Sequence, residues 1–169
     1  PPTAAAPPPP APPAMDIKAV TADLVGVWEK DDINSDNEKE LYDIMELSWV
    51  FSQAAKLLKT VTIAMESGDR LRLTTAAGMI AISEDYPLDG KPSNQNRRDM
   101  RSGTCSGFVE PAIGKPVPGM YLTLSFQGEL SGTQREYFYV ENNTLYREME
   151  LELTNGKTWA GKSIFHRRS

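Results

Sequence analysis

Hydrophobic and polar residues alternate with a period of two along most of the chain after Lys59. In "VTIAM", for example, Val61, Ile63 and Met65 share one side. Such alternation is typical of strands with one face in a core and one in solvent. Turn signals separate the further segments of this kind, which are "LRLTT" at 71–75, "MIAIS" at 79–83, "TCSGFVE" at 104–110, "MYLTLSF" at 120–126, "REYFYVE" at 135–141, "TLYREMELEL" at 144–153 and "TWAGKSIFHRR" at 158–168.

Residues 35–59 change to the period of a helix. In "SDNEKELYDIME", Ser35 is the predicted N-cap and Glu38 completes a capping box. The apolar residues of this segment share one helical face: Leu41, Ile44 and Met45. Ser48 is the predicted cap of a second helix, "WVFSQAAKLLK", whose apolar stripe contains Val50, Phe51, Ala54, Leu57 and Leu58. The segment before the pair, "ADLVGVWEKDD" at 22–32, is predicted to be the first strand.

Roughly nine short strands joined by turns predict a mainly β fold, either a sandwich or a barrel. The helices are too few and too early in the chain for a parallel sheet with helical crossovers. We therefore expect an antiparallel fold with a helix–turn–helix inserted after the first strand.

The first fifteen residues differ from the rest in composition, because "PPTAAAPPPPAPPA" holds eight of the thirteen prolines. Such a segment cannot form a core and is typical of an extended, semi-rigid chain. We predict a Pro/Ala-rich tail or linker at 1–15 and one folded domain at 16–169. The tail is either a passive tether or a docking segment for a partner.

Composition excludes several function classes. A net charge of −5 argues against nucleic-acid binding, which needs a basic face. The single Cys105 excludes an internal disulfide and cysteine-cluster metal sites, and the single His166 leaves little for a zinc site or a Ser-His-Asp triad. No apolar run approaches the roughly 18 residues of a membrane-spanning helix. No set of acid, base and nucleophile stands out, so we predict a protein that is not an enzyme and holds no metal.

The stretch "GKTWAGKS" at 156–163 fits the pattern of a phosphate-binding loop. That loop must leave a buried parallel strand and open a helix, but only six residues follow Ser163 and an alternating strand precedes Gly156. Asn155-Gly156 is instead a strong signal for a β-hairpin turn. We predict a hairpin here and no nucleotide site.

Three further features have a structural and a functional interpretation. "RRDMR" at 97–101 could hold a phosphate or an acidic partner, although a solvated loop is favoured. Asn142-Asn143-Thr144 fits a glycosylation acceptor, although a hairpin turn is favoured. Cys105, between Gly103 and Gly107, is predicted to be a small strand residue, and His166 a surface residue.

The chain order of one strand, two helices and an antiparallel meander resembles the fatty-acid-binding proteins, small barrels of the wider lipocalin (calycin) group. The matching segments are "LVGVW" at 24–28, similar to the Gly-x-Trp that opens most members, the helix pair at 37–59, "GDRLRLTT" at 68–75 and "SIFHRR" at 163–168. The chain resembles more loosely the small lipocalin-like proteins of plant and algal plastids. The resemblance covers most of residues 23–169 and implies an up-and-down β-barrel.

The resemblance also assigns structural roles. Gly26 would let the chain bend where the barrel closes, and Trp28 would fill the closed end. An arginine of the last strand packs across this indole in lipocalins, as a cation–π contact. If Phe165 faces inward, alternation turns Arg167 inward too, which makes Arg167 the candidate and Arg168 the fallback.

The sequence departs from the family at its ligand clamp. Fatty-acid-binding proteins hold the carboxylate with an Arg-x-Tyr pair on the last strand, and the nearest positions here are Ser163 and Phe165. Arg147, on the apolar face of 145–153, is the candidate contact for an acidic ligand head, unless it pairs with an inward acid or sits at the open rim. Tyr137 and Tyr139 are weaker candidates, because the inward side of their strand is ambiguous.

Two functions remain open at this point. The first is a carrier or sensor that encloses a small apolar molecule such as a lipid, isoprenoid or pigment. The second is an accessory subunit of a larger, photosynthetic membrane complex, docked through its tail and barrel exterior. We expect an intracellular soluble or peripheral protein, and the resemblance to plastid proteins points to a chloroplast.

Overall fold

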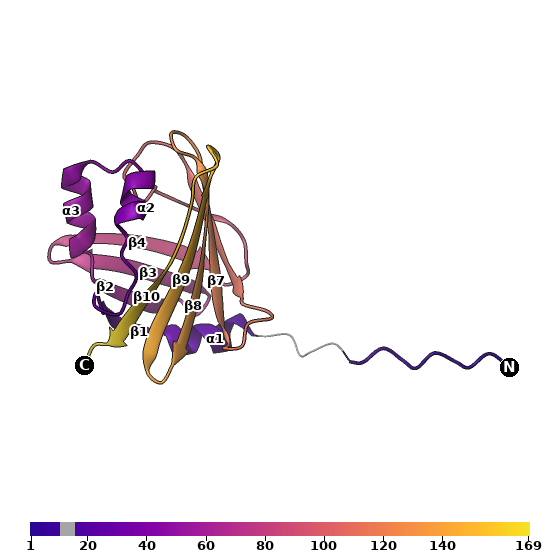
Figure 1. Ribbon diagram of the computed structural model, residues 1–169. Coiled ribbons are helices and arrows are strands. Elements are labelled where there is room, and N and C mark those ends of the chain that lie inside the picture. Colours follow the sequence, from indigo (N-terminus) through magenta and orange to yellow (C-terminus); the bar gives the residue numbers. More distant parts are fainter. Residues whose placement is uncertain (11–15) are drawn as a thin grey trace.

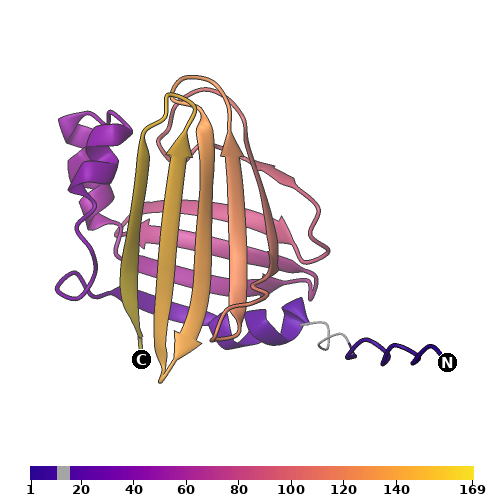
Figure 2. The ribbon, with the colours of Figure 1, turned by 45° about the vertical axis from the view of Figure 1, so that its right-hand side comes forward.

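The computed structural model describes residues 1–10 and 16–169. Ten antiparallel strands form one sheet that curls into a nearly closed barrel (Figures 1 and 2). Each strand pairs with its neighbour in the chain except β4 and β5, which are the two edges of the sheet, and β1 pairs with β10. This confirms the predicted mainly β, antiparallel barrel. The helices are α1 (Ile17–Leu24), α2 (Lys39–Ile44) and α3 (Trp49–Leu57); the strands are β1 (Gly26–Lys30), β2 (Thr60–Glu66), β3 (Arg70–Ala77), β4 (Ile80–Pro87), β5 (Ser93–Gln95), β6 (Cys105–Pro111), β7 (Gly119–Phe126), β8 (Gly132–Glu141), β9 (Thr144–Leu153) and β10 (Thr158–Arg167).

The core is formed by the inward-facing residues of the strands. On β2 and β3 the alternation places Val61, Ile63, Leu71 and Leu73 inside, each at most 3% exposed. Every strand except the three-residue β5 contributes at least one buried side chain to the same cluster. The period of two in the sequence therefore reports the two faces of the barrel wall.

Helix α1 corrects the prediction of a strand over 22–32, because Ile17–Leu24 is helical and β1 begins only at Gly26. Asp16 caps the helix by accepting a hydrogen bond from the Lys18 amide at 3.0 Å. Val20 and Leu24 are buried, and α1 lies at the end of the barrel opposite α2 and α3 (Figure 2). Two apolar positions four residues apart suit one helical face, so the local pattern did not require a strand.

The predicted helix pair is present, but the first cap is wrong. Helix α2 begins at Lys39, and no side chain caps it at Glu38. The hydroxyl of Ser35 instead accepts a hydrogen bond from the Ile164 amide at 2.9 Å, which ties the loop before α2 to β10. Ser48 does cap α3, since its hydroxyl accepts from the Phe51 amide at 3.3 Å.

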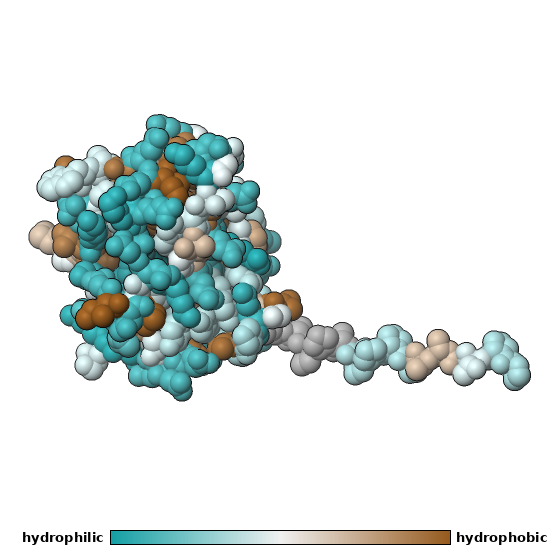
Figure 3. Space-filling view, in the orientation of Figure 1, coloured by the Kyte–Doolittle hydropathy of each residue, from teal (hydrophilic) through white to brown (hydrophobic). Residues whose placement is uncertain are grey.

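The two helices differ in how they bury their apolar faces. Leu41, Ile44 and Met45 of α2 pack against the core as predicted. The stripe predicted for α3 is largely exposed, which corrects that expectation: Val50 is 66%, Phe51 50% and Leu57 62% exposed. Helix α3 stands beside the barrel rim and not across it (Figure 1). On the face shown in Figure 3, hydrophobic residues form separate small groups within a mainly hydrophilic surface.

Both predicted hairpins are confirmed. Asn142 and Asn143 join β8 to β9 with φ angles of 52° and 58°, the left-handed values that a tight two-residue turn requires. Gly156, with φ of 88°, turns the chain between β9 and β10. Lys162 and Ser163 lie within β10, so the segment 156–163 has no strand-to-helix loop that could hold a phosphate.

Residues 1–10 of the Pro/Ala-rich segment are exposed and adopt neither helix nor strand. The remainder of the predicted tail, 11–15, lies outside the described residues. The domain boundary at residue 16 stays a prediction; Asp16 is the N-cap of α1.

The closed end of the barrel contains the three residues that the resemblance singled out. Trp28 is fully buried, and the guanidinium of Arg167 lies 4.2 Å from the centroid of its ring. Arg167 also donates to the side chain of Asn143 at 2.9 Å and to the Val25 carbonyl at 3.1 Å. A Cβ at Gly26 would collide with this guanidinium, so the absence of a side chain there makes room for it.

We predict that Arg167→Met lowers the free energy of unfolding by about 1–2 kcal/mol, because it removes a cation–π contact and two hydrogen bonds. Equilibrium denaturation in urea, followed by tryptophan fluorescence, measures this loss. Arg168→Met is the matched control, and a surface change of this kind should stay within about 0.5 kcal/mol of wild type. Equal effects of the two variants would contradict a specific role for Arg167.

Candidate functional site

The interior of the barrel contains a cavity of about 210 Å³ below the two helices. Its walls are mainly apolar and come from both the sheet and the helices. The sheet contributes Val61, Leu124, Met149 and Phe165, and the helices contribute Leu41, Met45 and Ala55. The same inward alternation that builds the core therefore also builds this cavity.

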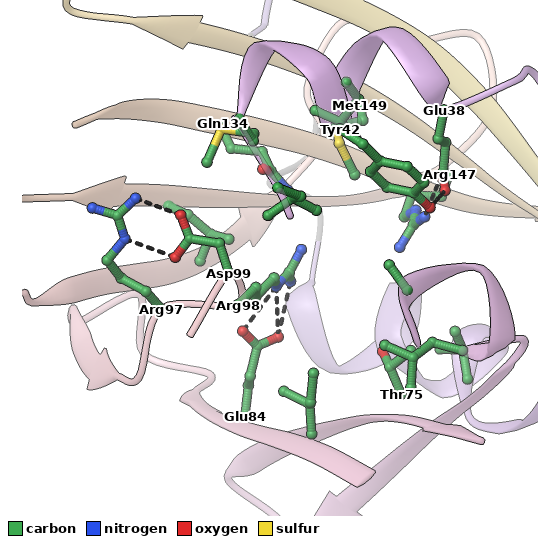
Figure 4. Close-up of a pocket in the computed structure, with 18 of the residues that line it drawn as sticks. Glu38, Tyr42, Thr75, Glu84, Arg97, Arg98, Asp99, Gln134, Arg147 and Met149 are labelled. Atoms are coloured by element: carbon green, nitrogen blue, oxygen red, sulfur yellow. Dashed lines mark hydrogen bonds and ion pairs between the residues drawn. The ribbon is translucent and has the colours of Figure 1, made fainter. Parts of the chain in front are cut away.

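Arg98 brings a charge into the barrel from the segment that follows β5. Its Nε and Nη2 donate to Glu84 on β4, at 2.9 and 2.8 Å (Figure 4). Its Nη1 contacts Glu136 on β8. Glu136 is fully buried, whereas the Arg98 side chain keeps 27% of its accessible area. Arg98 also lines the cavity.

The charges in this cluster hold one another ionised. Burial alone acts to raise the pKa of Glu136, but the neighbouring Arg98 and then Arg147 lower the pKa below its usual value. For Arg98, burial opposes the charge, yet Glu136 and Glu84 raise the pKa well above its usual value. Two carboxylates against one guanidinium make this end of the cavity an acceptor-rich, internally paired cluster.

Arg147 anchors a second polar cluster on β9, the strand that pairs with the Glu136 strand β8. Its Nη2 lies 3.5 Å from Glu38, at the start of α2, and 3.4 Å from the hydroxyl of Ser163. The second oxygen of Glu38 contacts the Lys30 ammonium at 3.0 Å and accepts from the Tyr42 hydroxyl at 2.8 Å. Burial acts to raise the pKa of Glu38, but the charges of Arg147 and Lys30 lower the pKa on balance.

Three buried polar atoms lack a hydrogen-bond partner among the described residues: Arg147 Nε, Glu136 Oε2 and the Tyr86 hydroxyl. An unpaired buried donor costs free energy comparable to a lost hydrogen bond. Arg147 lines the cavity, so its Nε is a donor that a bound molecule could satisfy.

The structure places the predicted site residues on two different faces. Arg147 lines the cavity and lies over the Phe165 ring at 5.5 Å. Tyr137 and Tyr139 do not line it, which corrects their assignment as contacts of an enclosed ligand. They stack on each other at 4.6 Å in a separate cluster with Ala112, away from Phe138, which faces the core.

The prediction of a solvated loop at 97–101 is also corrected. Arg97 is 3% exposed and pairs with Asp99 at 2.6 Å, while Arg98 points into the barrel. The sequence did contain a sign of this buried arginine, because two carboxylates occupy strand positions that face the core. Glu84 alternates with Tyr86, and Glu136 with Phe138, so each falls on a core-facing position and needs a buried cation.

Cys105 and His166 lie where the sequence predicted them, in a strand and on the surface. Cys105 lies in β6, is 2% exposed, and burial raises the pKa of its thiol. His166 is exposed and lies 2.8 Å from Asp31. In the described parts of the chain, no group of His, Cys, Asp and Glu could hold a metal ion. Within the same ranges no helix has the length and apolar character needed to cross a membrane.

Solved structures with this fold include several lipid-binding proteins. Lipid binding protein 8 of Caenorhabditis elegans aligns with a TM-score of 0.68 at 13% identity, over 87% of this chain and 96% of that chain. Fatty-acid-binding protein 1 of Echinococcus granulosus aligns with a TM-score of 0.64 at 11% identity, over 88% and 99%. Zebrafish ileal bile acid-binding protein, complexed with cholic acid, aligns with a TM-score of 0.58 at 11% identity, over 86% and 99%.

No protein-family model matches the sequence, and no curated protein matches it either. At identities this low, the structural comparisons show a shared fold. They confirm the calycin-type barrel that the sequence resemblance implied.

We predict that Glu136→Gln destabilises the protein by about 2–3 kcal/mol at neutral pH, because Arg98 loses one of two buried countercharges. The folded-state pKa of Glu136 is lowered, so its contribution is present above the unfolded pKa and is lost as the pH falls through the folded value. The gap between wild type and variant should therefore shrink in acid. Denaturant titrations between pH 7 and pH 3 measure it.

The control for this prediction is Glu152→Gln, on the exposed side of β9. It removes one carboxylate of the same kind and should stay within about 0.5 kcal/mol of wild type. A Glu136→Gln variant as stable as this control would show that the buried pair contributes nothing net to folding.

Proposed function

We propose that this protein binds a small apolar ligand, such as a lipid, isoprenoid or pigment, inside the barrel without transforming it. The observation that carries the proposal is the cavity of about 210 Å³ with mainly apolar walls below α2 and α3. Ligand sites are typically concave and apolar, with a few placed polar groups. Arg98 and Arg147 are such groups here.

Apolar burial would supply most of the affinity, at about 25 cal/mol for each Å² removed from water. The cations of the cavity wall contribute less, because each already contacts a carboxylate: Arg98 contacts Glu84, and Arg147 contacts Glu38. A ligand therefore has no unmatched cation to neutralise. The cavity is also small beside the roughly 300–1,000 Å³ of ordinary ligand pockets, which favours a slender ligand.

Arg147 is our proposed hydrogen-bond donor to the bound molecule inside the cavity. Its Nε is buried without a hydrogen-bond partner among the described residues, and the residue lines the cavity. The proteins of the same fold named above bind fatty acids or bile acids according to their descriptions, and such molecules pair an acidic group with an apolar body. Ser163 and Phe165 occupy the positions of the family's Arg-x-Tyr pair, so other residues would have to bind an acidic group here.

The alternative of an accessory subunit rests on the tail and the barrel exterior, and the comparisons do not support it. The same holds for a plastid location, because the proteins of the same fold named above are not described as plastid proteins. Both stay predictions from the sequence. The carrier function is preferred since it uses a feature that a filled structural barrel would lack.

A substitution that fills the cavity tests the proposal. Thr75 of β3 lines the cavity, whereas the adjacent Thr74 bonds to Ser83 on the exposed side of the wall. We predict that Thr75→Trp weakens binding of the neutral fluorescent probe N-phenyl-1-naphthylamine by about tenfold or more, because the indole takes the space of the ligand. Thr74→Trp, the matched control, should bind like wild type.

Fluorescence titration gives the affinities, and displacement by a fatty alcohol, a fatty acid and an isoprenoid ranks the ligand classes. Circular dichroism verifies that both variants fold. The proposal fails if folded wild-type protein does not bind the probe, or if the two tryptophan variants bind it equally well.

A further inference from the structure

A second pocket, of about 360 Å³, adjoins the barrel cavity at its rim. It lies among the end of β1, the loop before α2 and the end of α3. The two pockets share the lining residues Lys30, Glu38, Tyr42, Ala55 and Leu58. The two pockets are therefore adjacent, and a molecule that is longer than the cavity would extend along this shared wall toward the second pocket.

The shared wall has a polar and an apolar side. The polar side is the Glu38 cluster, in which Lys30 and Tyr42 contact one carboxylate oxygen and Arg147 the other (Figure 4). The apolar side is Ala55 and Leu58, at the end of α3. An apolar chain can lie along Ala55 and Leu58 while a charged group stays beside the polar side.

The second pocket is lined by four lysines and by three acidic residues, Asp32, Asp36 and Glu38. Its lining therefore has a formal charge of +1, whereas the chain as a whole carries −5. The lysines are Lys30, Lys39, Lys56 and Lys59. Lys59 contacts Asp32, and Lys39 contacts Asp43 at 2.7 Å, but both lysines remain substantially exposed, at 46% and 76%. Lys56 makes no ion pair with any of the described residues. The pocket thus offers hydrated, partly exposed ammonium groups, which suit a phosphate.

We propose that the ligand is a single-chain amphiphile with a phosphate head, bound with its chain in the barrel cavity and its head in the lysine-lined pocket. This proposal rests on the proposed function. An anion buried deep in the cavity would meet cations that are already paired, and desolvating it there would be costly. At the rim the same anion keeps part of its hydration and meets Lys56, which has no ion-pair partner among the described residues, beside the partly exposed Lys39 and Lys59.

The orientation is tested with two ligands that share one chain, dodecyl phosphate and dodecanol, titrated calorimetrically below their aggregation thresholds into the full chain. Dodecanol reports the apolar cavity alone. We expect dodecyl phosphate to bind about tenfold tighter, with an advantage that falls as salt is added. If neither ligand binds, the proposed function itself fails. If both bind equally, the cavity function stands and the phosphate subsite is wrong.

Charge reversal locates the head. Lys56→Glu should weaken dodecyl phosphate binding by about three- to tenfold and leave dodecanol unchanged, since exposed ion pairs contribute modestly. Lys18→Glu, on α1 at the opposite end of the barrel, makes the same change of net charge and should affect neither ligand. Both lysines are exposed, so both variants should fold.

Arg147→Gln distinguishes the opposite orientation. If the head lies deep in the barrel, Arg147→Gln would weaken dodecyl phosphate binding far more than dodecanol binding and Lys56→Glu would weaken neither, which would overturn the proposal. Loss in the Lys18→Glu control as large as in Lys56→Glu would overturn it as well, because the effect would then be one of net charge.

Discussion

The hydrogen-bonded sheet of this barrel ends at β4 and at β5, and within the described residues polar side chains join these two edges. The amide of Gln95, in β5, donates to the Asp85 carbonyl of β4 at 2.7 Å. Three residues further on, Arg98 donates hydrogen bonds from two nitrogens to Glu84 of β4. Closing the wall in this way places a guanidinium inside the barrel, and a buried charge must be matched. Glu136, on β8 across the barrel, supplies the second negative charge that pairs with Arg98.

This closure decides where a ligand can go. The Arg98 cluster crosses the interior from the seam to β8, and the described cavity lies between it and the helices. The other end is filled by Trp28, with Arg167 across its ring and α1 beside it. What stays open is a space under α2, next to the second polar cluster around Glu38. The described cavity therefore lies in the half of the barrel next to α2 and α3.

Sequence periodicity sufficed for the antiparallel strands, the helix pair and both hairpins, because alternation and turn residues are local properties. It left a sandwich and a barrel open, and the family resemblance favoured the barrel. Periodicity failed where the answer depends on distant residues. Arg98 sits in a polar run, and its partners are 14 and 38 residues away. Both faces of β8 are rich in large side chains. The local sequence therefore could not decide whether Phe138 or Tyr137 faces the core, since this depends on how the whole sheet pairs. The apolar stripe at 49–58 correctly predicted a helix, but it did not predict whether that stripe is buried.

The missing family clamp has a physical counterpart in the structure. Ser163 pairs in register with Arg147 of the neighbouring strand, and Phe165 lies under the same guanidinium. The arginine is therefore still inside, but a carboxylate of the protein's own, Glu38, stands where a ligand's acid group would otherwise neutralise it. A barrel that matches its inner charges itself does not need a ligand's charge in order to fold. Selectivity for an anionic ligand would then come from cations whose charge is not fully paired with a carboxylate. These are the exposed lysines of the second pocket at the rim, among them Lys56.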